Sequence, residues 1–175
     1  MAGKTGAAAL ALVLLAAGAA RADILPNPTL EGGIALANVT ISVADLDRST
    51  KFYQALGFAA GDRHAIPPGL AQKSLGAKAD AKLDVRFISR NSVLIELVHI
   101  VPTITKPAST GAAGQLGLSH FAFRVDDVSR VAALVKANGG TVDEATRASL
   151  GPAMEAVFCT DPDGTRLELV GPTKK

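Results

Sequence analysis

Two glutamates and one histidine occupy repeated positions of this sequence, each inside an otherwise apolar, strand-like segment. Glu96 lies in LIELV and Glu168 in the near copy RLELV, while His120 begins HFAFRV and Asn38 begins the related NVTISV. Two carboxylates in one apolar cleft repel each other unless a proton, a basic side chain or a cation neutralises them. One imidazole and two carboxylates around an open position suit a divalent metal ion whose shell is completed by water.

An ordinary ion pair is the alternative for each glutamate. Arg86, Arg124 and Arg166 are the candidate partners in neighbouring strands. A single strand glutamate is more often explained in this way, but the repetition of both polar positions favours a functional site. If Arg124 and Arg166 line the same cleft, they could instead bind an anionic substrate.

The first half is expected to form a βαβββ module. Residues 34–43 alternate apolar and polar side chains, which is typical of a strand with one buried face. A helix that ends at Gly57 and a short strand should follow. The segment 61–82 is expected to be a long, irregular binding loop or lid, and strands 83–89 and 92–99 should form a hairpin.

The second half repeats this order. Asp161-Pro162-Asp163-Gly164 predicts a tight turn before the last strand. Neither four-stranded sheet could bury both faces alone, so the two modules should pair. The elements expected in this half are strands at 120–125, 141–146, 153–159 and 166–170 and a helix that starts near Val128 and is closed by Asn138-Gly139-Gly140.

Strand parity predicts where the repeated polar side chains point. His120 faces away from Phe121 and Phe123, whose aromatic face should pack on the helix. Glu168 likewise opposes its two leucine neighbours. If the polar sides of the first and last strands line one concavity, the four repeated positions converge there.

The N-terminal segment 1–22 is expected to be a signal peptide. Lys4 gives a positive start, residues 7–17 form an uninterrupted apolar run, and cleavage is expected near Ala22. The run is too short to span a bilayer. We therefore expect a periplasmic or secreted bacterial protein, with an extended lead-in over 23–34.

Charge and composition limit the partners of the mature chain. Removal of Lys4 and Arg21 would leave 16 basic and 16 acidic residues, with one Tyr and no Trp. Nucleic acid and anionic membrane surfaces are therefore not expected partners. About 150 residues suit one domain with its own core. The single Cys159 has no internal disulfide partner and is expected to be inert packing.

Four segments give the chain a resemblance to the vicinal oxygen chelate superfamily, which includes glyoxalase I, methylmalonyl-CoA epimerase, extradiol dioxygenases and bleomycin resistance proteins. The resemblance covers residues 35–172 and implies an α+β fold. Two paired βαβββ modules, 35–100 and 117–172 with linker 101–116, would form a curved, half-barrel mixed sheet around a central cleft, with helices outside. The segments are ANVTISVADLDRSTKFYQALGF, LIELV, LSHFAFRVDD and FCTDPDGTRLELVG.

The resemblance also implies a ligand set. Metal-using members take ligands from the first and last strands of each module, which gives Asn38, Glu96, His120 and Glu168 here. Asn38 departs from the family pattern, because His is usual there, so Asn38 is a weak or absent ligand. A single His at these positions disfavours Fe(II) dioxygenase chemistry. Ni, Co, Zn or Mn is therefore expected rather than Fe.

The implied activity is that of a metal-dependent, glyoxalase-like lyase or isomerase. It would act on a small carbonyl-containing molecule through an enediolate, with Glu168 or Glu96 exchanging a proton at the adjacent carbon. Arg124 and Arg166 would bind the substrate. The alternatives are a metal-free binder of the bleomycin-resistance type, which the loss of His at Asn38 favours, and a domain that serves only for assembly. A homodimer is a further expectation from the superfamily.

Overall fold

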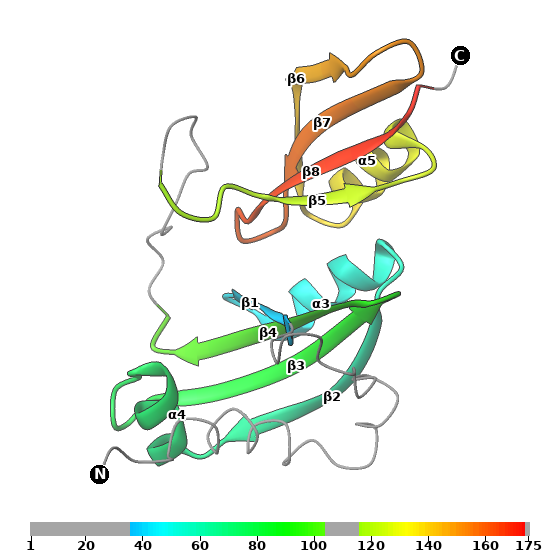
Figure 1. The fold of residues 1–175 in the computed structure, drawn as a ribbon. Coiled ribbons are helices and arrows are strands. Elements are labelled where there is room, and N and C mark those ends of the chain that lie inside the picture. Colours follow the sequence, from blue (N-terminus) through cyan, green and yellow to red (C-terminus); the bar gives the residue numbers. More distant parts are fainter. Residues whose placement is uncertain (1–35, 104–115, 174–175) are drawn as a thin grey trace. The chain divides into compact units, whose positions relative to one another are not determined.

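The computed structural model describes residues 36–103 and 116–173, which divide into two compact units (Figure 1). Unit 1 contains residues 36–46 and 58–103, and unit 2 contains residues 47–57 and 116–173. The expected signal peptide, the whole lead-in and most of the linker lie outside the described residues. No helix in the described ranges is long and apolar enough to cross a bilayer.

Unit 1 is built on a four-stranded mixed sheet with the strand order β1-β4-β3-β2. The first strand pairs in parallel with the last, and the other pairs are antiparallel. The alternating pattern of the first strand and the predicted hairpin are confirmed. The elements are β1 (Val39–Ser42), β2 (Ala59–Ile66), α4 (Pro68–Leu75), β3 (Lys82–Arg90) and β4 (Val93–Val101).

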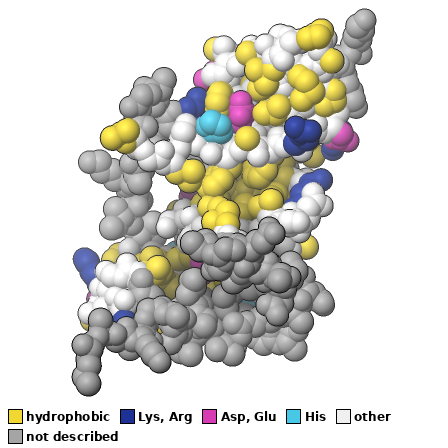
Figure 2. Space-filling view, viewed as in Figure 1, with side chains coloured by type: hydrophobic (Ala, Val, Ile, Leu, Met, Phe, Trp, Pro, Cys, Tyr) yellow, Lys and Arg dark blue, Asp and Glu magenta, His cyan; other side chains and the backbone are white. Residues whose placement is uncertain are grey.

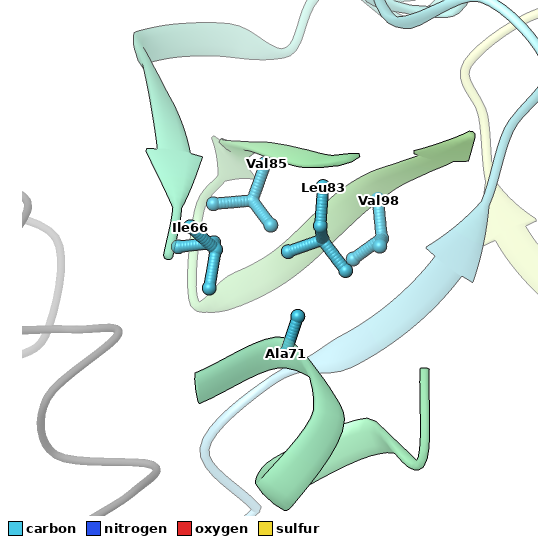
Figure 3. Close-up of a cluster of buried hydrophobic side chains, with 5 residues drawn as sticks. All are labelled: Ile66, Ala71, Leu83, Val85 and Val98. Carbon is cyan, nitrogen blue, oxygen red and sulfur yellow. The ribbon is translucent and has the colours of Figure 1, made fainter. Parts of the chain in front are cut away.

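Helix α4 is the main departure of unit 1 from the sequence prediction. An irregular loop is wrong for much of 61–82, because β2 continues to Ile66 and a helix follows. Pro68 starts this helix, where its missing N–H is not needed, and Gly76 ends it with a φ of 67°. The helix covers an apolar cluster formed by Ile66, Ala71, Leu83, Val85 and Val98 (Figure 3).

Unit 2 repeats the sheet, with the order β5-β8-β7-β6 and a parallel β5–β8 pair. Asp127 caps the helix α5 by accepting a 2.9 Å hydrogen bond from the backbone N–H of Arg130. The predicted α+β class is confirmed, as is the βαβββ order of both halves, apart from the additional helix α4 in the first. The elements are α3 (Leu46–Ala55), β5 (Phe121–Arg124), α5 (Val128–Ala137), β6 (Thr141–Ser149), β7 (Met154–Thr160) and β8 (Arg166–Pro172).

Helix α3 is encoded in the first half of the sequence, yet all of its residues after Leu46 belong to unit 2. The buried hydroxyl of Tyr53 donates a 2.9 Å hydrogen bond to Asp161. Arg48 forms an ion pair with Asp163, and Ser49 donates to the same carboxylate at 3.0 Å. The tight turn before β8 therefore docks on a helix that lies more than 100 residues earlier in the chain.

Gly140 lies where unit 2 leaves no space for a side chain. A Cβ there would lie 2.4 Å from the carbonyl oxygen of Thr160, 2.7 Å from Val135 and 2.9 Å from Phe52. Gly140→Ala should therefore lower the free energy of unfolding by about 2 kcal/mol, because backbone must move to relieve the overlap. Denaturant unfolding should show this loss, whereas Gly69→Ala, inside α4 and with nothing within 4 Å of the added Cβ, should raise stability by up to about 1 kcal/mol.

Candidate functional site

The candidate residues of unit 1 are centred on Glu96, in the middle of β4. Only 8% of this residue is exposed. Oε2 accepts hydrogen bonds from Oγ1 of Thr40 at 2.9 Å and from Nδ2 of Asn38 at 3.2 Å. The sheet register explains these contacts, because Thr40 pairs directly with Glu96 and Asn38 lies two residues earlier on the same side. Both hydrogen bonds that Glu96 accepts from described residues reach Oε2.

Burial also changes the ionisation of Glu96. Desolvation raises the pKa of Glu96 above its ordinary value, and the hydrogen bonds from Thr40 and Asn38 oppose this shift without cancelling it. The ionised carboxylate is therefore costly in its own surroundings. A nearby positive charge would offset that cost.

This cost predicts that a neutral isostere stabilises the metal-free protein. A folded-state pKa above the unfolded value stabilises the fold at low pH, and this contribution is lost as pH rises through the folded pKa. Glu96→Gln, which retains the acceptor for Thr40, should therefore raise the free energy of unfolding at pH 7 by on the order of 1 kcal/mol. Urea titrations in chelator should show the gain at pH 7 and little difference near pH 4. An equal or lower stability at pH 7 would contradict this account.

The candidate residues of unit 2 lie on the face of its sheet that is turned away from α5. Nε2 of His120 is 3.3 Å from Oε2 of Glu168, and the two side chains are 30% and 20% exposed. Ala122 pairs with Glu168, so His120, two residues before Ala122, repeats the placement of Asn38 beside Glu96. Figure 2 shows a histidine beside an acidic side chain on the surface of unit 2.

The parity prediction for Glu168 is confirmed in unit 2, whereas Phe121 and Phe123 are only half-buried. Leu167 and Leu169, which flank Glu168, are fully buried, as are Val128 and Val135 of α5. One face of the sheet therefore forms the core with the helix. The other face carries His120 and the carboxylate of Glu168.

Two residues of this half were missed by reasoning from the sequence. Oγ of Ser119 lies 3.0 Å from Nδ1 of His120, and the Phe158 ring meets the imidazole edge-on, with 5.0 Å between ring centroids. Strand register could have found Phe158, because it pairs directly with Glu168, just as Phe87 pairs with Glu96. For Ser119, adjacency to His120 was the only signal.

The predicted substrate-binding arginines lie on strands of unit 2. The guanidinium carbon of Arg166 is 3.9 Å from the centroid of the Phe158 ring, a cation–π contact. Arg124 is an exposed residue at the end of β5. Among described residues, neither Glu96 nor Glu168 has an arginine partner. The ion-pair alternative for the two glutamates is therefore not what the structure shows.

The structure thus brings the predicted ligands together in pairs, Asn38 with Glu96 and His120 with Glu168. Within the described ranges, no group of three or more His, Cys, Asp or Glu side chains lies close enough to hold a metal ion.

Cys159 is buried, as expected, and burial raises its pKa to about 12, with a smaller contribution from the charge of Asp161. This thiol is therefore not a nucleophile at neutral pH.

Comparison with known proteins gives one family and several structural relatives. A family model for the Glyoxalase/Bleomycin resistance protein/Dioxygenase superfamily matches residues 35–169. A probable chloroplastic lactoylglutathione lyase from Arabidopsis thaliana is 33% identical over 140 residues, which make up 78% of this chain. The match covers only 36% of that plant protein, so the chain spans little more than a third of its relative's length.

Solved structures with a similar fold include the following two. A glyoxalase family protein from Bacillus cereus has a TM-score of 0.70 and 16% identity, covering 86% of this chain and 99% of that one. The fosfomycin resistance protein FosX from Listeria monocytogenes, complexed with Mn(II) and sulfate, has a TM-score of 0.51 and 18% identity, covering 79% of this chain and 93% of that one. At these identities the likeness concerns the fold.

Proposed function

The chain belongs to the glyoxalase/bleomycin resistance protein/dioxygenase superfamily, and on this premise we propose that it is a divalent-metal-dependent lyase or isomerase acting on a small carbonyl-containing molecule. The observation that carries the proposal is the pair formed by Nε2 of His120 and Oε2 of Glu168, 3.3 Å apart on the sheet face turned away from α5. We propose Asn38 and Glu96 as the remaining positions of the ligand set, with Asn38 the weak member.

The donor atoms of this pair fit a metal ion. Zinc–nitrogen and zinc–oxygen bonds of about 2.0–2.1 Å with tetrahedral angles place neighbouring donors roughly 3.3 Å apart. The observed separation of 3.3 Å is the same, so the pair needs little rearrangement to act as adjacent ligands. A set of one imidazole, two carboxylates and one amide suits Zn, Ni, Co or Mn.

The proposed chemistry is proton transfer beside a carbonyl. When bound, the ion would polarise the substrate carbonyl and make the adjacent C–H more acidic. Glu168 or Glu96 would accept that proton and return it to the neighbouring carbon or oxygen. Phe158 would provide an apolar surface next to the reacting atoms, and Arg166, stacked on Phe158, would bind an anionic group of the substrate together with Arg124.

The plant relative, a probable lactoylglutathione lyase, supports lyase chemistry.

We also propose that the chain is exported after cleavage near Ala22 and that it forms a homodimer. Export favours a carbonyl substrate other than lactoylglutathione, because the thiol cofactor of glyoxalase I is chiefly cytosolic. Cell fractionation, N-terminal sequencing of the mature protein and size-exclusion chromatography test these statements.

Metal uptake by the mature chain tests the central proposal. Protein stripped with chelator and exposed to Ni²⁺, Co²⁺, Zn²⁺ and Mn²⁺ should retain about one ion per site after desalting. His120→Ala and Glu168→Gln should lose that ion. His64→Ala, which alters a histidine in β2, is the matched control and should keep it. A wild-type protein that retains no ion at excess metal would defeat the proposal.

A metal-free small-molecule binder is the second candidate. Asn38 favours it, because its amide donates a hydrogen bond to Glu96 at 3.2 Å and its neutral oxygen is a poorer ligand than imidazole. Glu168→Gln separates the two functions once a ligand has been found by screening carbonyl compounds. An enzyme should lose turnover, whereas a binder should retain most of its affinity.

A further inference from the structure

Ser119 and Glu168 hold the imidazole of His120 through its two ring nitrogens. Oγ of Ser119 lies 3.0 Å from Nδ1, while Nε2 lies 3.3 Å from Oε2 of Glu168. Phe158 contacts the same ring at an interplanar angle of 86°. The ring therefore has a defined orientation, with Nδ1 directed to a hydroxyl and Nε2 to a carboxylate.

In the internal repeat, Ser119 occurs only in the half that also has the histidine. In the second half Ser119 directly precedes His120, and at the equivalent place in the first half Ala37 precedes Asn38. Ser119 and Ala37 are both exposed, so burial does not explain why one is a hydroxyl and the other a methyl. The half with the imidazole has the hydroxyl beside it, and the half with the amide does not.

A hydroxyl is suited to this place because it both donates and accepts hydrogen bonds. In the metal-free protein, Oγ–H can donate to unprotonated Nδ1, and the ring proton then lies on Nε2, which donates toward Glu168. For Nε2 to act as a ligand, the ring proton must lie on Nδ1, and the hydroxyl then accepts from it. Ser119 can satisfy Nδ1 in both states by rotating its O–H.

We propose that Ser119 is a positioning residue that stabilises whichever tautomer of His120 the site requires, with or without a bound ion. It supports the Nε2–H form when the site is empty and the Nδ1–H form when Nε2 is a ligand. This inference rests on the proposed metal-dependent function. It adds to that function a residue that touches neither the ion nor the substrate.

Zn²⁺ affinity of the full mature chain tests the inference by competition with a chromophoric chelator. Ser119→Ala should weaken Zn²⁺ binding by about 10–100-fold, the usual effect of removing a hydrogen-bond partner of a ligating histidine. Ser119→Thr, which keeps the hydroxyl, should restore affinity to within about threefold of wild type. Ser92→Ala, a control at an exposed serine in the β3–β4 turn, should bind like wild type.

A second measurement reports on the ring itself. In ¹⁵N spectra of the Zn²⁺-loaded wild type, Nδ1 of His120 should show the shift of a protonated, hydrogen-bonded nitrogen, and Ser119→Ala should move this signal. Thermal unfolding should show that Ser119→Ala remains folded, because the replaced side chain is exposed.

The outcomes separate this inference from the function on which it rests. If the wild type binds Zn²⁺ and Ser119→Ala binds it equally well with an unchanged ¹⁵N signal, the role of Ser119 is refuted and the metal site stands. If Ser119→Thr binds as weakly as Ser119→Ala, the role of the hydroxyl is refuted. If the wild type binds no Zn²⁺ at all, the proposed metal function fails first.

Discussion

Asn38→His should raise the affinity of the protein for Zn²⁺ by tenfold or more, which corresponds to about 1.4 kcal/mol or more of binding free energy. Asn38 directly precedes β1, just as His120 directly precedes β5, and each lies two residues ahead of the residue that pairs with a glutamate. An imidazole is a better ligand than a neutral amide for the proposed ions. Chelator competition on wild type and variant measures the change directly.

The double variant Ala37→Ser with Asn38→His extends this prediction. It copies the Ser119–His120 pair into the first half, so its Zn²⁺ affinity should exceed that of Asn38→His alone. Asn38→Gln is the control, because it keeps an amide and adds no imidazole. Affinity that does not rise in Asn38→His would mean that the first half contributes no ligand at this position, and that His120 and Glu168 hold the ion without it.

Asp161→Ala should lower the free energy of unfolding by about 3–4 kcal/mol, because it leaves several buried hydrogen-bond donors without an acceptor. The Asp161 carboxylate is 2% exposed and accepts from Tyr53 at 2.9 Å. Its other oxygen accepts the backbone N–H groups of Asp163 at 2.9 Å and Thr165 at 2.8 Å. Guanidinium denaturation followed by circular dichroism measures the loss.

Two controls define what the loss in Asp161→Ala means. Asp126→Ala removes a carboxylate that is 77% exposed and forms an ion pair with Arg130, so it should change stability by less than about 0.5 kcal/mol. Tyr53→Phe removes a single donor to Asp161 and should cost about 1–2 kcal/mol. A loss below that of Tyr53→Phe in Asp161→Ala would show that the turn does not hold α3 in solution.

The alternation of polar and apolar residues predicted much of this structure. The related segments of the two halves predicted the same order of strands along the chain in each half, and the two sheets also share one spatial strand order. The same parity predicted that His120 and Glu168 share a face, where their side chains meet. These predictions succeed because a strand has a two-residue period that a short segment displays completely.

Other features depend on contacts that a local pattern does not contain. Helix α4 forms in a segment rich in Gly and Pro because Ala71 packs on an apolar cluster from three strands. In the sequence, Phe158 looks like an ordinary core residue. Only the pairing of β7 with β8 places it beside His120. The hydroxyl of Ser119 becomes informative only once the direction of the neighbouring imidazole is known.

The membership of α3 in unit 2 has a consequence for how the polypeptide is made. The apolar and aromatic side chains of this helix, Phe52 and Tyr53, leave the ribosome long before the strands that bury them, since the contact with Asp161 spans 108 residues. In a nascent chain halted after residue 103, the apolar side chains of α3 would be exposed, because the sheet that buries them would not yet have been synthesised. Synthesis must therefore be completed before that surface is hidden, and during this interval the chain should depend on holdase chaperones that shield exposed apolar segments.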